Sequence, residues 1–230
     1  MNLVRQFFFM AMVLISTSKS WAQEWGQQAR FIYVGDPMCS WCYGFGGELD
    51  GFLSNHPDVP VELVMGGLRA YGKESMASLS DFLRSHWREV AQKTGVKFNE
   101  AVLSKEMLYD TEPACRAVVA FMMISKSDPL AFFKSVQKLF YVDGADLYNP
   151  VAYKDIVTKM GGSYPDFSQK FLRDARKQVT MHFARANSLG AASFPTLFYT
   201  DGKEVYKLSD GFASRTALES AYKKIKSNNK

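Results

Sequence analysis

The chain has 230 residues, 47% of them hydrophobic, and a formal net charge of +5. This length can bury a good core but is short for two independent domains, so one compact folding unit is expected. Basic residues are spread along the chain apart from a lysine-rich end, with no charged stripe and no recognisable nucleic-acid-binding module. Nucleic acid is therefore not an expected partner.

The first 22 residues are typical of a cleaved signal peptide. Arg5 supplies a positive charge, Phe7 to Ile15 is a short apolar run, and Ser20 and Ala22 are small residues before a cleavage site. The apolar run is too short for a permanent transmembrane helix, although an uncleaved anchor stays the minor alternative. Export predicts an oxidising compartment, most simply a bacterial periplasm, and leaves a net charge of about +3.

The next element is an apolar strand candidate, Phe31 to Val34. It is followed by the segment 36–45, Asp-Pro-Met-Cys-Ser-Trp-Cys-Tyr-Gly-Phe, and by a predicted helix from about residue 45 to 55. A Cys-x-x-Cys pair between a strand and a helix is typical of a thiol–disulfide redox site. The helix N-terminus offers unpaired N–H groups and a partial positive charge, which favour the thiolate of Cys39. Cys42 is less than one helical turn further on, and is therefore expected to attack a mixed disulfide on Cys39.

Half of a zinc site and two inert core cysteines are the alternatives for this pair. Zinc requires about four ligands, and neither Cys115 nor the three scattered histidines have a suitable spacing. We therefore expect Cys39 as the nucleophile, Cys42 as the resolving thiol, and no metal or other cofactor. Cys115, at the start of a predicted helix, is either a small buried side chain or a thiol close to the redox pair.

A second strand candidate, Pro60 to Met65, completes a β-α-β unit that should be parallel and right-handed. From about residue 75 to 195 the pattern predicts helix after helix, with prolines near several helix starts and glycines after several ends. The predicted helices are 80–94, 111–125, 130–142, 151–160 and 166–188, the last with a break near Asp174.

Sheet signals return only at the end of the chain. Pro195 to Thr200 is a predicted strand, Asp201-Gly202 is a turn, and Lys203 to Lys207 is the returning strand. A closing helix capped by Ser214 runs to Ile225. This order predicts an α/β fold, a thioredoxin fold interrupted by a large all-helical insertion.

The expected parts are a signal peptide at 1–22, an N-terminal thioredoxin-fold part with the Cys-x-x-Cys at 23–68, a helical insertion with a connecting helix at 69–189, and a C-terminal part at 190–230. In a thioredoxin core, the proline that opens the penultimate strand follows a cis peptide bond. We expect Pro195 in this position, which leaves the backbone of Phe194 free to pair with an extended substrate segment. A trans proline at the start of an edge strand is the alternative.

Three segments together resemble the DsbA-type thioredoxin-fold oxidoreductases, in particular the FrnE-like branch, often described as predicted disulfide isomerases. They are 36–45, the sequence Glu112 to Ala117, and Phe194-Pro195-Thr196-Leu197. The resemblance spans nearly all of the chain after the expected signal peptide. It implies thiol–disulfide exchange on protein substrates, with Cys39 attacking, Cys42 resolving and Pro195 shaping the substrate groove.

Two features depart from that family. Thioredoxins and DsbA proteins commonly have a buried carboxylate about six residues before the first cysteine, where this chain has Tyr33. The nearest acid is Asp36, so either Asp36 substitutes or proton transfer uses water. The dipeptide Ser40-Trp41 also lacks the histidine that helps make DsbA strongly oxidising, which predicts an intermediate reduction potential. Trp41, expected to be exposed with little to pack on, and Phe194 would contribute an apolar surface for unfolded chains.

The expected function is disulfide exchange with unfolded or misoxidised exported proteins, as an oxidase or a modest isomerase. Only about seven residues separate Gln23 from the first strand, so no dimerisation domain is expected and the protein should be a monomer without a stable membrane anchor. A further redox partner must recharge the site. One alternative is a glutathione-dependent isomerase or transferase of the hydroxychromene-carboxylate isomerase or kappa type, which generally has serine at the attacking position. A non-catalytic binding or metal-carrying protein is the other.

Overall fold

The computed structural model describes residues 28–228, so the expected signal peptide lies outside the described residues. The strands are β1 (Arg30–Gly35), β2 (Val61–Met65), β3 (Thr196–Thr200) and β4 (Val205–Asp210). They form one sheet in the order β2-β1-β3-β4. β1 is parallel to β2 and antiparallel to β3, and β3 is antiparallel to β4. The first strand is therefore interior, beside a strand from the far end of the chain.

Between β2 and β3 the chain forms successive helices, as the sequence predicts. The break near Asp174 is present, and the segment expected as one helix at 151–160 is a 3-10 turn followed by a short helix. The helices are α2 (Ser40–Ser54), α3 (Ser80–Thr94), η1 (Glu100–Ser104), α4 (Glu112–Ile124), α5 (Pro129–Tyr141), η2 (Pro150–Tyr153), α6 (Lys154–Lys159), α7 (Tyr164–Leu172), α8 (Ala175–Ser188) and α9 (Arg215–Asn228).

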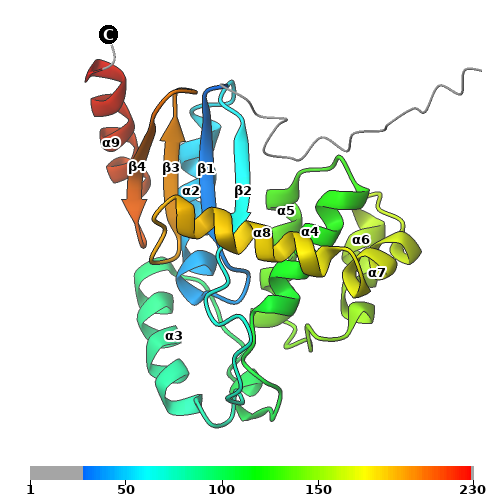
Figure 1. Ribbon diagram of the computed structural model, residues 1–230. Coiled ribbons are helices and arrows are strands. Elements are labelled where there is room, and N and C mark those ends of the chain that lie inside the picture. The colour runs from blue at the N-terminus through cyan, green and yellow to red at the C-terminus, as the bar shows by residue number, and fades with distance from the viewer. Residues whose placement is uncertain (1–27, 229–230) are drawn as a thin grey trace, which may run out of the picture.

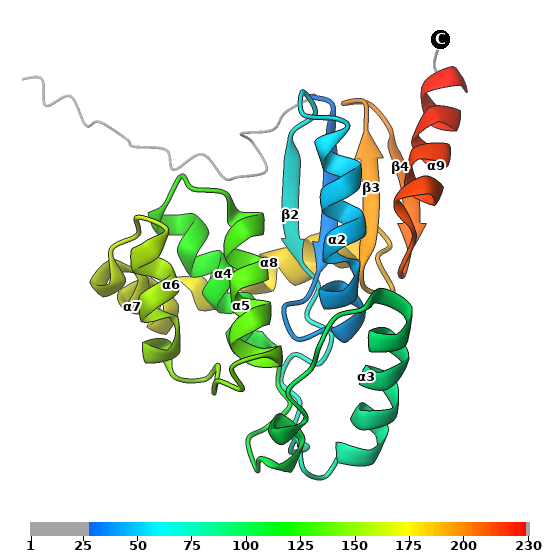
Figure 2. The same ribbon diagram turned by 180° about the vertical axis from the view of Figure 1, so that it is seen from behind.

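Alternate side chains of β1 point to opposite faces of the sheet, as the two-residue period of a strand requires. Phe31 packs against Phe52 of α2 and Tyr222 of α9, with ring centroids 4.9 and 5.2 Å apart. Ile32 lies on the other face in a buried cluster with Ala186 of α8. Figure 2 shows α2 in front of the sheet, and Figure 1 shows α8 crossing the opposite face.

α4 is the centre of the helical block. Its first ten residues, Glu112–Phe121, are all buried, because the helix packs against α5, α7 and α8. α8 also contacts β2, and Figure 1 shows it running from the sheet to the block. Core residues of the sheet and of the block belong to one continuous apolar cluster. In the part of the chain that the structure describes, no helix has both the length and the apolar character needed to cross a membrane.

Two expected boundaries are wrong. α2 begins at Ser40, about five residues earlier than predicted, because burial of Phe45 outweighs the low helix propensity of its flanking glycines. β4 begins at Val205 and ends at Asp210, because the turn before it is longer than two residues. In that turn the Asp201 carboxylate accepts hydrogen bonds from the N–H groups of the residues at 203 and 204.

Candidate active site

The Cys-x-x-Cys pair lies where β1 leads into α2. Cys39 is the N-cap residue of α2, with φ −86° and ψ 116°, and Cys42 lies in the first turn. Both thiols are free, and the two sulfurs are hydrogen-bonded to each other. Both residues are buried, and Cys39 keeps 4% of its surface exposed whereas Cys42 keeps 1%. Cys39 stands at the N-terminus of α2, but its side chain makes no capping hydrogen bond to the N–H groups of the helix end.

The peptide bond between Phe194 and Pro195 is cis, as the sequence predicts, and it lies directly before β3. The Sγ atom of Cys39 is 3.5 Å from the carbonyl oxygen of Phe194. The Phe194 ring packs so closely on Gly66 that a Cβ there would lie 2.3 Å from the ring. The fold thus brings Cys39, Cys42 and Pro195 together from opposite ends of the sequence.

Asp36 is completely buried in the turn before Cys39. Its carboxylate accepts hydrogen bonds from the N–H of Met38 (2.8 Å), the N–H of Leu68 (2.7 Å), the hydroxyl of Thr111 and the thiol of Cys115 (3.4 Å). Burial raises the pKa of Asp36, and these four hydrogen bonds oppose that shift. The carboxylate therefore ties the redox turn to the segment after β2 and to the start of α4.

Cys115 is fully buried in the first turn of α4. Burial raises the pKa of its thiol, and the neighbouring Asp36 carboxylate raises it further. The protonated thiol donates to Asp36, so Cys115 is both a buried side chain and a partner of the turn that carries Cys39.

Tyr33, six residues before Cys39, reaches the redox pair. Its hydroxyl is hydrogen-bonded to Cys42. Burial is the main cause that raises the pKa of the phenol, and the interaction with Cys42 raises it further. Burial also raises the pKa of the Cys42 thiol, and the hydrogen-bonded sulfur of Cys39 adds to this shift. Hydrogen bonds from the backbone of Asp36 and from Tyr33 act in the opposite direction. In the sequence, Tyr33 stood out only because it occupies the position of the buried carboxylate that thioredoxins and DsbA proteins commonly have. Its spacing of six residues from Cys39 was the signal for a role at the redox pair.

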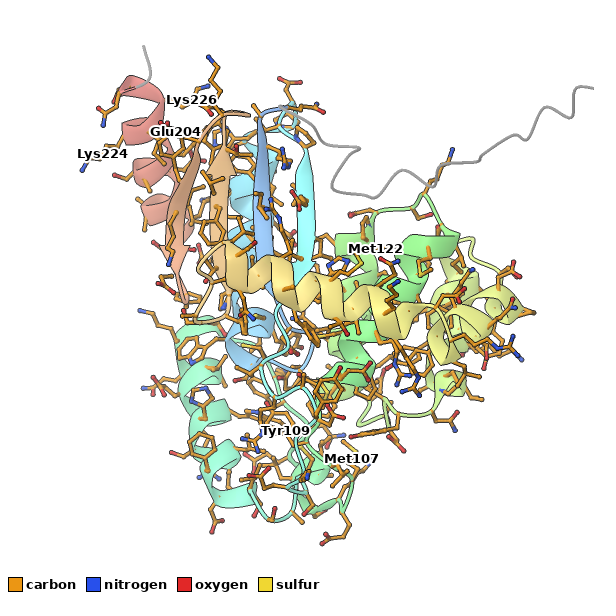
Figure 3. The ribbon with its side chains drawn as sticks, in the orientation of Figure 1. Met107, Tyr109, Met122, Glu204, Lys224 and Lys226 are labelled. Atoms are coloured by element: carbon orange, nitrogen blue, oxygen red, sulfur yellow. The ribbon has the colours of Figure 1, made fainter. Side chains whose placement is uncertain are left out.

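Tyr109 is a site residue that no sequence pattern predicted. Its hydroxyl donates a hydrogen bond to the carbonyl of Met38 at 2.9 Å. Tyr109 belongs to the stretch between α3 and α4, which lies below the strands in the view of Figure 3. This stretch contains no motif, and only the packing of the helical block against the redox turn reveals the contact.

The expected exposure of Trp41 is wrong. The residue is half-buried, and its ring contacts Phe212 and His86 of α3 at centroid separations of 5.6 and 6.0 Å. α3, from a different part of the sequence, packs along α2 and supplies this cover. Tyr43 stacks on Tyr141 with ring centroids 4.9 Å apart, and Phe194 is half-buried beside the cysteines.

Within residues 28–228, no three His, Cys, Asp or Glu side chains are grouped to hold a metal ion.

No known family profile and no curated protein sequence matches this chain. Solved structures are similar. A proposed protein disulfide isomerase from Nitrosomonas europaea is 28% identical, with a TM-score of 0.80 over 88% of this chain and 100% of that one. The cytosolic disulfide reductase DsbM from Pseudomonas aeruginosa is 22% identical, with a TM-score of 0.69 over 86% and 98% of the two chains. A 2-hydroxychromene-2-carboxylate isomerase is 14% identical, with a TM-score of 0.57 over 86% and 97%.

The sheet order, the helical insertion and the structural similarity together define a thioredoxin fold of the α/β class with a helical insertion, the fold that DsbA-type structures share. The enzyme class of the protein is thiol:disulfide oxidoreductase. Within that class, it is similar over nearly all of its described residues to the Nitrosomonas protein.

Proposed function

We propose that this protein exchanges disulfides with exported protein substrates through Cys39 and Cys42, as an oxidase or a modest isomerase. The observation that carries this proposal is the contact between the two sulfurs at the start of α2, with Cys39 Sγ 3.5 Å from the carbonyl of Phe194. A thiol pair at a helix N-terminus beside open backbone is suited to disulfide exchange with an extended chain.

In the reducing or isomerising direction, the Cys39 thiolate attacks a client disulfide, forms a mixed disulfide and releases one client thiolate. Cys42 then gives up its proton and attacks the Cys39 sulfur, which closes the Cys39–Cys42 disulfide and releases the second client thiolate. Oxidation of a client runs through the same mixed disulfide in reverse. Because burial raises the pKa of Cys42, this sulfur keeps its proton until the mixed disulfide has formed.

Client binding is proposed at the rim of the same site. The backbone of Phe194 would pair with an extended client segment, and the half-buried rings of Phe194 and Trp41 would contact its apolar side chains. Pro195 would hold this backbone against Cys39. An unfolded or misoxidised protein offers such segments, whereas a folded protein has most of them paired internally.

Export to the periplasm is part of the proposal, and the signal-like composition of residues 1–22 supports it. DsbM, which has the same fold, is described as cytosolic, so the compartment needs its own test. Fractionation of cells that make the full chain should recover the protein in the periplasm, shortened by 22 residues. Recovery of the uncleaved chain in the cytosol would contradict export. The monomeric state and the recharging redox partner belong to the same proposal.

A glutathione-dependent isomerase or transferase is the second candidate. The similarity to 2-hydroxychromene-2-carboxylate isomerase favours it, and DsbM has also been solved with glutathione, at 23% identity to this chain. The attacking position in this chain holds Cys39 rather than serine. Turnover of a chromene carboxylate with glutathione by the Cys39→Ser protein would favour this candidate over disulfide exchange.

The main test compares oxidation of reduced ribonuclease with refolding of scrambled ribonuclease, for the wild type and for Cys39→Ser and Cys42→Ser. We expect Cys39→Ser to abolish both activities, because the attacking sulfur is lost. Cys42→Ser should accumulate a mixed disulfide with the client, visible on a non-reducing gel. Equal activity of wild type and Cys39→Ser would overturn the proposal, and the ratio of the two wild-type activities separates oxidase from isomerase.

A further inference from the structure

We infer that the hydroxyl of Tyr33 is a catalytic group of this exchange, because it donates a hydrogen bond to the Cys42 sulfur whenever that sulfur becomes a thiolate. The inference rests on the proposed function and adds a residue to its mechanism. The hydroxyl of Tyr33 is already in hydrogen-bonded contact with Cys42 in the dithiol form. It therefore touches one of the two reacting sulfurs.

The position of the Tyr33 ring is determined by its own strand. A Cβ at Gly35 would lie 2.8 Å from both Cζ and the hydroxyl oxygen of Tyr33, so the ring lies over a glycine that leaves room for it. Phe45 and Phe133 hold the ring, with centroid separations of 6.0 and 5.8 Å. Tyr33 is 1% exposed, so its hydroxyl is shielded from solvent, and its hydrogen-bond partner is Cys42.

Among the described residues, none of the strongest electrostatic partners of Cys42 is cationic. The titratable groups near it on the packed elements include Tyr33 on β1, Asp36 in the turn, Cys39 at the start of α2, Tyr109 before α4 and Tyr141 at the end of α5. Hydrogen-bond donors must therefore stabilise a thiolate here. Two are directed at Cys42, the backbone of Asp36 and the phenol of Tyr33.

The phenol is suited to donate, and the nearby carboxylate is not. Burial and the neighbouring Cys42 raise the pKa of Tyr33, so the phenol keeps its proton through the working pH range. An ionised carboxylate can only accept hydrogen bonds, and that of Asp36 already accepts four. Tyr33 therefore stabilises the Cys42 thiolate from the position where thioredoxins and DsbA proteins commonly have a carboxylate. The proton of Cys42 itself passes to solvent.

Cys42 is a thiolate at two points of the exchange. When a client thiolate attacks Cys39 in the Cys39–Cys42 disulfide, the S–S bond breaks and Cys42 leaves with the electron pair. When Cys42 attacks Cys39 in the mixed disulfide, its S–H proton goes to water and the client sulfur leaves as a thiolate. The phenol of Tyr33 donates a hydrogen bond in both steps and keeps its proton, so no further oxidant or reductant is required.

The test uses stopped-flow reaction of the reduced full chain with one equivalent of 5,5′-dithiobis(2-nitrobenzoate). Attack by Cys39 releases the first thionitrobenzoate, and closure by Cys42 releases the second. In Tyr33→Phe we expect the first release within about twofold of the wild type and the second slowed about tenfold or more, as expected for the loss of a hydrogen bond to a charged group. The pH midpoint of the second release should rise by about one unit.

The matched control is Tyr153→Phe, which removes another buried hydroxyl, one that donates to the carbonyl of Leu147 at 2.7 Å. Both releases should match the wild type in this variant. If the first release is absent from the wild type, the proposed function fails, independently of Tyr33. If the first release is normal and Tyr33→Phe closes at the wild-type rate at every pH, the inference about Tyr33 is overturned.

A second variant serves if Tyr33→Phe does not fold. Site-specific 3,5-difluorotyrosine at position 33 keeps the ring and the hydroxyl but makes the phenol a stronger hydrogen-bond donor. Closure by Cys42 should then show a lower pH midpoint than in the wild type. An unchanged midpoint would contradict the inference.

Discussion

At the scale of single residues, buried polar groups organise the site. Asp36 collects donors from three separate segments, and one of these donors is the thiol of Cys115. A buried carboxylate without such partners would be strongly destabilising, so each donor offsets part of the cost of its burial. A thiol donor at position 115 explains an unpaired cysteine in the centre of this core without assigning it a redox role.

The burial of Cys115 predicts that its thiol is unreactive in the folded protein. We expect no reaction of Cys39→Ser/Cys42→Ser with 5,5′-dithiobis(2-nitrobenzoate) in native buffer, and one equivalent after unfolding in guanidinium chloride. The physical reason is that Cys115 is 0% exposed and that burial raises the pKa of its thiol. Reaction of the folded protein at the rate of a free thiol would contradict this expectation.

At the scale of elements, α2 carries the chemistry and is unusually rich in glycine. Gly44 faces α3, where an added Cβ would lie 2.8 Å from Val90 Cγ1 and 2.9 Å from Thr94 Cγ2. Gly47, one turn later, meets nothing within 4 Å. The first glycine lets α3 approach closely enough to cover the start of α2, whereas the second lowers helix stability without a packing role.

These two glycines predict opposite effects of one substitution. Gly47→Ala should stabilise the protein by about 0.5–1 kcal/mol, because alanine has the higher helix propensity. Gly44→Ala should destabilise it by about 1–3 kcal/mol, because the methyl group overpacks the contact between α2 and α3. Urea unfolding curves measure both free energies, and equal shifts in the same direction would contradict this account of the α2–α3 contact.

At the scale of the whole molecule, α8 joins the sheet to the helical block. It contacts both β2 and α4, and its His182 is buried against the end of β2. The Nδ1 atom of His182 accepts a hydrogen bond from the N–H of Met65 at 3.3 Å. Burial lowers the pKa of His182 to about 4, so the ring is neutral in the folded protein at physiological pH.

The lowered pKa of His182 predicts a loss of global stability in mild acid. Between about pH 6.5 and pH 4 the unfolded chain binds a proton at this ring and the folded chain does not, so the free energy of unfolding falls as pH falls. The loss amounts to about 3 kcal/mol across that interval. His182→Gln keeps an acceptor for Met65 without a titrating ring. We expect the stability difference between wild type and variant to shrink from pH 7 to pH 4, and a constant difference would contradict this.

The sequence alone was sufficient for the local features of this protein. The β-branched run before the Cys-x-x-Cys segment and the prolines near helix starts depend on backbone preferences within a few residues, whereas the cis bond before Pro195 was predicted from its place in a thioredoxin core. The order of elements then allowed few topologies for a parallel β-α-β unit with a distant β-β-α end. The resemblance to DsbA-type proteins rested on the same short segments.

Tertiary structure alone decided which distant side chains meet at the sulfurs. The donors to Asp36 come from positions 38, 68, 111 and 115, and the cover of Trp41 comes from α3 and Phe212. The contact of the Tyr33 hydroxyl with Cys42 depends on how the ring lies over Gly35 and against Phe133 of α5. Periodicity and turn chemistry report only local conformation, whereas these contacts depend on how far-apart segments pack, because burial of their apolar faces determines where the polar atoms end up.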